Sequence, residues 1–187
     1  MYYPLMLRVA GEPCLVVGGG KVALQKARAL CRAGARVTAV SPEFLPAFER
    51  LKIDRLLRRR FRPSDVAHKI LVVAGTGDTE VNRSVYRACR KRSLPVNVVD
   101  APELCSFIVP SILRRGPVTV AVSTGGLSPS LAKALRKHLE TLLPASIERL
   151  ALRLGAERGN IMRRIPSSSA RTRILKGLVK GLRIGTR

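Results

Sequence analysis

"PCLVVGGGKVALQKARALCRAGARVTAVSPE", residues 13–43, is the stretch that decides the fold of this chain. Residues 14–17 are an apolar run typical of a parallel strand buried on both faces. Apolar residues then recur at helical spacing, and Gly34 suits the left-handed position just past a helix end. Because residues 36–40 read as a second strand, the stretch predicts a β-α-β unit.

The turn between the first strand and the helix fits the pattern G-x-G-x-x-A at residues 18–23. Gly18 permits the tight turn, Gly20 lets the backbone approach a pyrophosphate, and Ala23 lets the helix pack closely on the strand. The helix N-terminus offers unpaired N–H groups to the phosphates. The pattern therefore predicts dinucleotide binding, and the alternative is a glycine turn in a Rossmann-like sheet that has lost its ligand.

The adenosine ribose of such a cofactor is often bound by an acid about 20 residues after the glycine turn. Here the second strand ends at Ser41, and the first carboxylate is that of Glu43, two residues later. Ser41, the backbone near Pro42 and Glu43 are the three candidates for this contact. NAD is favoured over NADP, with Lys21 and Arg36 as alternative partners of a 2′-phosphate.

The chain up to Asp100 continues to alternate strands and helices. We expect a helix at 43–52, a weak strand or turn at 53–61, a strand at 69–75, a helix at 78–93 and a strand at 94–100. This order predicts an α/β fold, a Rossmann-like doubly wound parallel sheet with right-handed crossovers. The loop at Gly75 and Thr76 would pass close to the cofactor, and Asp78 is interpreted as a helix N-cap rather than a catalytic group.

The pattern changes after this sheet. Residues 107–115 and 118–124 predict an antiparallel hairpin, and Ser128 is expected to cap a helix that ends before Pro144. One side of that helix is apolar and needs a partner surface, so we expect a homodimer. The expected division is a dinucleotide-binding Rossmann domain at 1–112, a dimerisation region at 113–145 and a basic helical region at 146–187, with Ile174, Leu175, Leu178, Val179 and Leu182 at helical spacing.

The chain carries 35 Lys and Arg against 12 Asp and Glu among 187 residues, a formal net charge of +23. Such an excess favours a polyanionic partner, which is nucleic acid, an anionic membrane or a small ligand with many carboxylates or phosphates. Adaptation to an intracellular salt or temperature is the other explanation. No apolar stretch reaches the roughly 20 residues that span a bilayer, and no secretory signal is recognisable.

The cysteines and histidines indicate neither disulfides nor a metal site. No CxxC pair and no neighbouring histidine accompanies the four cysteines, which are Cys14, Cys31, Cys89 and Cys105. We therefore expect reduced thiols, no resident metal and a soluble protein in the cytoplasm.

Three segments together resemble the precorrin-2 dehydrogenase family, which includes the amino-terminal module of bacterial sirohaem synthase. They are residues 2–43, the run "LVVAGTGDTEVNRSV" at 71–85, and the run from "VNVVDAP" to "LETLLP" at 96–144. The resemblance covers residues 2–150 in order, and its "NVVDAP" and "GGLSPSLA" elements are specific to the family.

The resemblance implies an oxidoreductase that uses NAD to oxidise precorrin-2 to sirohydrochlorin on the route to sirohaem or cobalamin. Some members also insert Fe²⁺, which would then be a substrate. The aspartate tied to activity in the family maps onto Asp100, a candidate base. Lys21 stands where the family commonly has an acid, and a serine phosphorylated in some members falls on Thr124. Combined with the glycine pattern, the expected cofactor contacts are Gly18, Gly19, Gly20, Lys21, Val22, Ser41, Pro42, Glu43, Gly75 and Thr76.

A tetrapyrrole polycarboxylate substrate would also account for the positive charge. The residues expected to contact it are Ser106, Phe107, Arg114, Arg115, Ser123, Thr124 and Gly125. The alternatives are a non-catalytic NAD-binding protein, a membrane-surface protein that uses the basic amphipathic tail, and a nucleic-acid-binding protein on a Rossmann scaffold. Aromatic residues make up only 4% of the chain and no nucleic-acid-binding motif is present, so we expect no nucleic-acid partner. We also expect no membrane partner.

Overall fold

The computed structural model describes residues 2–180, which form two compact units. The first unit ends at Ile108 and the second begins at Val109. The boundary expected after residue 112 differs from this division and falls inside a strand, β6 (Ser111–Arg115), of the second unit. The dimerisation and basic-region assignments within the second unit remain predictions.

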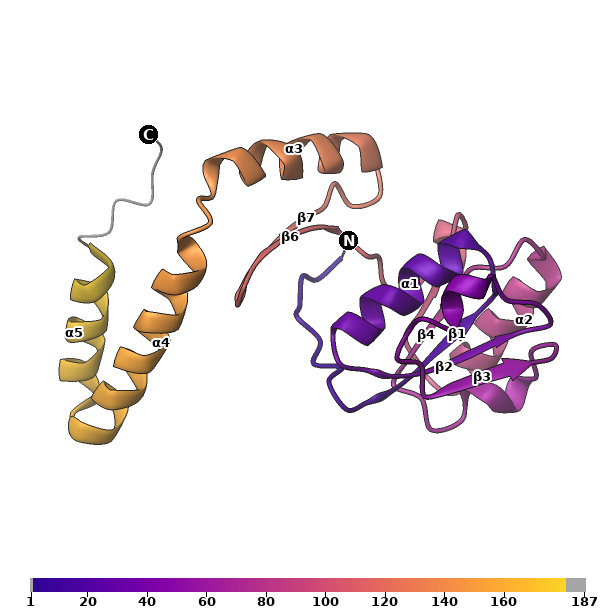
Figure 1. The fold of residues 1–187 in the computed structure, drawn as a ribbon, viewed down its shortest axis with the longest axis horizontal. Coiled ribbons are helices and arrows are strands. Elements are labelled where there is room, and N and C mark those ends of the chain that lie inside the picture. Colours follow the sequence, from indigo (N-terminus) through magenta and orange to yellow (C-terminus); the bar gives the residue numbers. More distant parts are fainter. Residues whose placement is uncertain (1, 181–187) are drawn as a thin grey trace. The chain divides into compact units, whose positions relative to one another are not determined.

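The first unit is built on a parallel sheet with the strand order β3-β2-β1-β4-β5 (Figure 1). Every neighbouring pair in it is parallel, which confirms the predicted Rossmann-like fold. The order reverses between β1 and β4, and the crevice at such a reversal is where open α/β sheets bind ligands. The strands are β1 (Pro13–Val17), β2 (Arg36–Ser41), β3 (Arg55–Arg58), β4 (Leu71–Ala74) and β5 (Val96–Val98).

Two hydrophobic clusters lie on the two faces of this sheet. Alternate residues of β1 point to opposite faces, so Leu15 and Val17 enter one cluster, and Cys14 and Val16 enter the other. Helix α1 (Lys21–Arg32) contributes to the second cluster, whereas helix α2 (Thr79–Arg90) contributes to the first. The sheet is therefore covered on both faces, as the continuous apolar character of its central strands requires.

Local end signals place both helices. Gly34 has a φ of +81°, and the Ala35 N–H donates to the carbonyl of Leu30 at 3.1 Å, so α1 ends as predicted. Asp78 accepts hydrogen bonds from the N–H groups of Glu80 and Val81 at 2.9 and 3.1 Å. This confirms Asp78 as the N-cap of α2.

The helix expected at residues 43–52 was wrong. Only a single short turn of 3₁₀ helix, η1 (Pro46–Phe48), forms there. Leu45 is held extended, with ψ of 141°, because a residue before proline is disfavoured in the helical region. The next segment forms strand β3, which pairs with β2. The weak strand expected at 53–61 is therefore present, but it is shorter than expected. Two further 3₁₀ turns are η2 (Pro63–Val66) and η3 (Pro102–Leu104).

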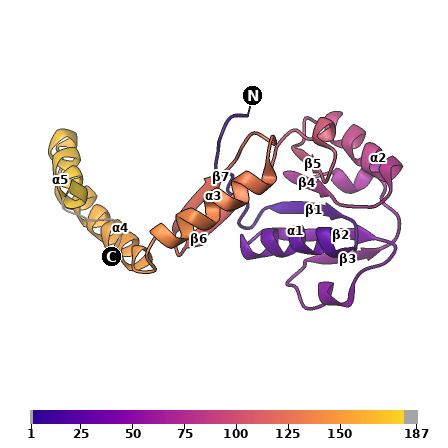
Figure 2. The same cartoon turned by 90° about the horizontal axis from the view of Figure 1, so that it is seen from above.

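The second unit begins with an antiparallel hairpin of β6 and β7 (Val118–Val122), as predicted. Helix α3 (Pro129–Leu142) lies along this hairpin (Figure 2). The Ser128 hydroxyl accepts a hydrogen bond from the Leu131 N–H at 3.2 Å, so the predicted N-cap is confirmed. Leu113 and Ala132 are buried between the hairpin and the helix.

Two more helices follow in the second unit, α4 (Ile147–Arg164) and α5 (Ser168–Lys180). They contact one another side by side, and neither contains a buried residue. Leu182, expected at the end of the last apolar face, lies outside the described residues. Within residues 2–180, no helix combines the length and the apolar character needed to cross a membrane.

Candidate functional site

The glycine loop after β1 is packed so tightly that side chains cannot be accommodated at its first two positions. A Cβ on Gly18, which has a φ of +122°, would lie 2.6 Å from the carbonyl oxygen of Gly75. A Cβ on Gly19 would lie 1.8 Å from the carbonyl oxygen of Glu43. The Leu45 N–H also donates to the Gly19 carbonyl at 3.0 Å, so the loop is held against the segment after β2.

A cavity of about 450 Å³ lies over this loop at the carboxyl ends of the strands. Eight of the ten expected cofactor residues line it, and these are Gly18, Gly19, Gly20, Ser41, Pro42, Glu43, Gly75 and Thr76. Lys21 and Val22 belong to the first turn of α1 but are not among the lining residues. The cavity therefore brings together the three loops that the sequence analysis selected, from β1, β2 and β4.

The N-terminus of α1 suits the phosphates of a dinucleotide. Its N-cap is Gly20, whose missing side chain leaves the first N–H groups uncapped, and no acid lies in the first turn. By contrast, Asp78 and Ser128 cap α2 and α3 with side-chain oxygens. A Cβ built on Gly20 meets no atom within 4 Å, so open space lies above the backbone. These features fit a diphosphate bound by backbone N–H groups and the helix dipole.

The loop after β4 is stabilised from inside the first unit. The Thr76 hydroxyl donates to the side-chain oxygen of Asn82, and the Asn82 amide donates back to the Thr76 carbonyl, at 2.9 and 3.1 Å. Asn82 is buried, which makes this reciprocal pair a fixed feature of the loop. Thr76 can therefore line the cavity while its hydroxyl is committed to α2.

Two residues that sequence reasoning missed, Arg60 and Phe61, also line the cavity. They follow β3, which brings them next to the end of β2 because Ser41 pairs with Arg58. Arg36, proposed above as a phosphate partner, lies instead at the start of β2, where its Nε donates to the Gly11 carbonyl at 3.0 Å. The parallel pairing of β2 and β3 is the missing signal, and no local motif reveals it.

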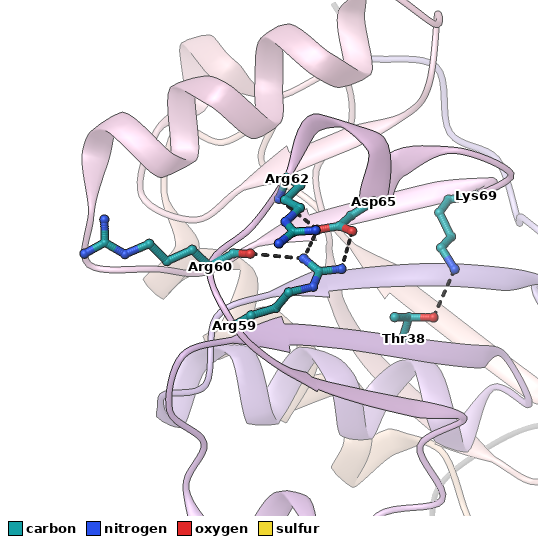
Figure 3. A network of polar contacts seen from close by, with 6 residues as sticks. All are labelled: Thr38, Arg59, Arg60, Arg62, Asp65 and Lys69. Atoms are coloured by element: carbon teal, nitrogen blue, oxygen red, sulfur yellow. Dashed lines mark hydrogen bonds and ion pairs between the residues drawn. The ribbon is translucent and has the colours of Figure 1, made fainter.

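An ion pair holds the segment that carries Arg60 (Figure 3). Arg59 donates from both terminal nitrogens to the Asp65 carboxylate at 2.8 and 2.7 Å, and the Arg62 N–H donates to it at 2.8 Å. Burial by itself would raise the pKa of Asp65, but these donors outweigh it and hold the pKa below the ordinary value of 3.8. Arg59 also donates to the Arg60 carbonyl at 3.0 Å, which fixes the backbone beside the cavity.

A second polar contact in Figure 3 joins the half-buried Lys69, which precedes β4, to the buried Thr38 of β2. Lys69 donates to the Thr38 hydroxyl at 3.0 Å, and burial, followed by the charge of Arg55, lowers the pKa of Lys69. All four cysteines are free thiols, and burial raises the pKa of Cys14 and of Cys89 to about 11. High thiol pKa values disfavour the reactive thiolate, so these two cysteines are core residues. Among the described residues, no cluster of His, Cys, Asp and Glu could hold a metal ion.

Asp100 lies just after β5, exposed and in the left-handed backbone region with φ of 58°. Within residues 2–180 its carboxylate accepts no hydrogen bond and joins no ion pair, so it does not cap the turn. The preceding residue, Val99, donates to the Ala74 carbonyl at 2.9 Å, and a Cβ on Gly75 would lie 3.6 Å from its side chain. Asp100 therefore follows a residue that adjoins the cavity loop, although it does not itself line the cavity.

Ser106 and Phe107, expected to contact substrate, both take part in covering the edge strand β5. The Ser106 hydroxyl accepts from the Val96 N–H at 2.8 Å, and the buried Asn97 amide donates to the Phe107 carbonyl at 3.0 Å. The Phe107 side chain packs against the hydrophobic cluster that includes residues of α1. These contacts give both residues a structural task, and their substrate role stays a prediction.

The other five substrate candidates belong to the second unit. The Thr124 hydroxyl accepts from the Ser128 N–H at 2.9 Å, and the Ser123 hydroxyl accepts from the Gly125 N–H at 3.1 Å, so this loop is ordered by its own side chains. Arg114 is exposed on β6. The half-buried Arg115 lies 4.0 Å from the Glu140 carboxylate, and its buried Nε has no hydrogen-bond partner within the described residues.

Comparison with protein families gives two matches along the chain. Residues 5–111 match a family described as putative NAD(P)-binding. Residues 115–142 match a family described as the central part of a sirohaem biosynthesis protein. The two matches follow one another in the order in which the first unit and the start of the second unit occur.

Curated relatives and a solved structure are similar over most of this chain. The siroheme synthase of Thioalkalivibrio sulfidiphilus is 46% identical over 183 residues, which is 96% of this chain and 37% of that protein. The siroheme synthase of Methylobacillus flagellatus is 50% identical over 79% of this chain and 32% of that protein. The chain thus spans about a third of these relatives. The precorrin-2 dehydrogenase SirC superimposes with a TM-score of 0.80 at 25% identity, covering 95% of this chain and 89% of that one.

Proposed function

The chain belongs to the putative NAD(P)-binding family that residues 5–111 match, and on this premise we propose that it oxidises precorrin-2 to sirohydrochlorin with NAD as the hydride acceptor. The observation that carries the proposal is the cavity over the uncapped N-terminus of α1. Similarity to siroheme synthases and to a precorrin-2 dehydrogenase supports precorrin-2 as the substrate. Biosynthesis of sirohaem is the corresponding pathway.

The residues of the first unit divide the binding of NAD between them. Backbone N–H groups at the start of α1 would receive the pyrophosphate, because no side chain occupies them. Ser41, Pro42 and Glu43 would receive the adenosine ribose at the end of β2. NAD supplies one function when bound, the acceptance of a hydride.

Removal of a hydride from the substrate must be accompanied by loss of a proton, which requires a base. Asp100 is the proposed base because its carboxylate is exposed and not used by any neighbour within the described residues. Its left-handed backbone carries strain, and strain in a non-glycine residue is often retained at functional positions. A carboxylate at the carboxyl edge of the sheet can take the proton and release it to water.

Positive charge on the second unit supports a polycarboxylate substrate. Arg114 and Arg115 lie on β6, and further cations project from α3. A guanidinium binds a carboxylate with two parallel hydrogen bonds, so such residues suit a tetrapyrrole that carries many carboxylates. We propose that Arg114, Arg115 and the loop at 123–125 contribute to binding this substrate.

We further propose that the functional form is a homodimer assembled through α3. Leu131, Leu135 and Leu142 are 50, 44 and 41% exposed, whereas Ala132, on the side of α3 that meets the hairpin, is buried. The apolar stripe predicted from the sequence therefore stays uncovered. A second copy of the chain presents an identical stripe, and two such faces can bury one another around a twofold axis.

A cytoplasmic location is part of the proposal. All four cysteines are free, which is the expected state in a reducing compartment. The enzyme would then act where NAD and the early tetrapyrrole intermediates are available.

The test is direct incubation of the purified chain with precorrin-2 and NAD, following absorption by NADH and by sirohydrochlorin. Equal amounts of the two products are expected. If the chain bound NADH in a separate titration but did not oxidise precorrin-2, a non-catalytic NAD-binding protein would be the better description. Absence of NADH binding would remove the proposal altogether.

The same preparation decides whether Fe²⁺ is a second substrate. Sirohydrochlorin and Fe²⁺ would be added anaerobically, without NAD, and formation of sirohaem followed against a protein-free control. An acceleration over that control would add metal insertion to the proposed activity, and no acceleration would restrict the chain to dehydrogenation.

A further inference from the structure

The part of the cavity at the end of β2 differs from an ordinary NAD site. In many Rossmann folds an acid at the end of the second strand hydrogen-bonds the ribose 2′-hydroxyl, and a nearby arginine accommodates a 2′-phosphate instead. Here β2 ends at Ser41, and Arg60 lines the same cavity as Ser41 and Glu43. Arg60 is the single cationic residue among the cavity-lining residues of the described chain.

Arg60 is held in place without using its own side chain. The guanidinium of Arg59 donates to the Arg60 carbonyl and is itself anchored to Asp65, whose side chain is 8% exposed. On the other side Phe61 packs against the hydrophobic cluster that includes α2. Figure 3 shows the Arg60 side chain extending away from Asp65.

The guanidinium of Arg60 is available for a ligand. It joins no ion pair and no hydrogen bond within residues 2–180, whereas its neighbours Arg58 and Arg59 are paired with Glu49 and Asp65. Glu43 lines the same cavity, but its carboxylate forms no ion pair with Arg60 within the described residues. A planar guanidinium with unoccupied donors matches a phosphomonoester dianion, which can accept two of its hydrogen bonds.

We propose that Arg60 reads the 2′ position of the adenosine ribose and lets this site accept NADP(H) as well as NAD(H), with the 2′-phosphate adding affinity. The inference rests on the proposed dinucleotide site and names the residue that sets its cofactor range. Neither basic residue suggested by the sequence takes this place, since Arg36 lies at the other end of β2 and Lys21 does not line the cavity.

Titration calorimetry with two adenosine fragments isolates the 2′-phosphate. 2′,5′-ADP and 5′-AMP share the adenosine and the 5′-phosphate and differ only at the 2′ position. The unmodified chain should bind 2′,5′-ADP about tenfold more tightly, as expected for one charge-assisted contact at a partly exposed site. Arg60→Leu should abolish that preference, and Arg60→Lys should restore part of it.

The matched control is Arg55→Leu, which removes the same charge from the other end of β3. It should keep the preference for 2′,5′-ADP, and thermal melting should show all three variants folded. Equal binding of the two fragments by the unmodified chain, or a preference that survives Arg60→Leu, would overturn the role of Arg60. If either result were found and the unmodified chain still bound NADH, the proposed function would stand without the role of Arg60. If the unmodified chain did not bind NADH, both the role of Arg60 and the proposed function would be refuted.

Discussion

The two units of this chain solve different structural problems. Within the described residues, all buried hydrophobic side chains belong to the first unit except Leu113 and Ala132. Its sheet is covered on both faces, and its loops meet at one cavity. The second unit has a small core under α3, and its helices α4 and α5 bury no residue.

The difference indicates which parts of the chain are self-sufficient. Large apolar side chains of the second unit lie exposed on several helices, among them Leu131, Leu152 and Val179. Surfaces of this kind mark a contact with another molecule. We infer that the first unit holds its dinucleotide site by itself, whereas the second unit depends on a partner surface, which we propose is another copy of the chain.

The largest expected effect comes from Gly19→Ala, which tests whether the first unit depends on its glycine loop. The new Cβ would lie 1.8 Å from the Glu43 carbonyl, so the two segments must separate. Denaturant unfolding should show a loss of more than about 3 kcal/mol, with loss of NADH binding. A variant with normal stability and affinity would contradict the described packing.

Gly20→Ala is the matched control for that substitution. Its φ of −84° suits alanine and no atom lies within 4 Å of the new Cβ, so stability should change by less than about 1 kcal/mol. NADH affinity should nevertheless fall, because the methyl group enters the space over the loop. Unchanged affinity would argue against phosphates at this position.

The next effect tests the dependence of the second unit on a partner. Leu131→Glu with Leu135→Glu places two charges on the exposed stripe of α3. Sedimentation should show self-association weakened at least a hundredfold, equal to about 2.7 kcal/mol, while NADH binding by the first unit persists. Lys133→Gln with Lys137→Gln, also on α3, is the control because it lowers the net charge by the same two units. A monomeric unmodified chain would refute the dimer.

A smaller effect probes the ion pair between Arg59 and Asp65, which holds the segment that carries Arg60. Asp65→Asn should destabilise the first unit by about 2 kcal/mol at neutral pH, because Arg59 loses a charged acceptor. The pKa of Asp65 is lowered on folding, so its stabilisation is present above 3.8 and is lost as the pH falls through the folded value. Unfolding free energies of the two proteins should therefore converge in acid. A constant difference across that range would contradict the ion pair.

The smallest effect concerns backbone strain at Asp100. Asp100→Gly should raise the unfolding free energy by about 0.5 kcal/mol, because glycine adopts a φ of 58° without a Cβ penalty. Thermal melting measures this change, with Ser93→Gly, also at positive φ, as the comparison. Destabilisation by Asp100→Gly would show that the carboxylate makes a stabilising contact.

Local patterns were sufficient to predict much of the first unit. The glycine turn, the end of α1 at Gly34 and the Asp78 cap depend on neighbouring residues only, and all were confirmed. The prediction of a helix at 43–52 was wrong. It relied on the apolar spacing and gave too little weight to Pro46, which disfavours a helical conformation at Leu45. Periodicity alone does not weigh such a restriction.

The missed part of the site depends on contacts between distant segments. Arg60 and Ser41 line the same cavity because β3 pairs with β2, and no sequence motif reveals the register of two parallel strands. For the same reason, the hydroxyl groups of Ser106 and Thr124 were selected without their backbone partners being foreseen. Residue types indicated the chemistry, but only the fold shows which donors and acceptors are already engaged.

The measurement that tests the central claim most directly is the rate of NADH formation by Asp100→Asn with saturating NAD and precorrin-2. The amide preserves size and backbone but cannot act as a base. The account predicts NADH affinity within about twofold of the unmodified chain and a rate at least about a hundredfold lower, the usual contribution of a positioned base. A variant that oxidises precorrin-2 at the full rate would contradict it.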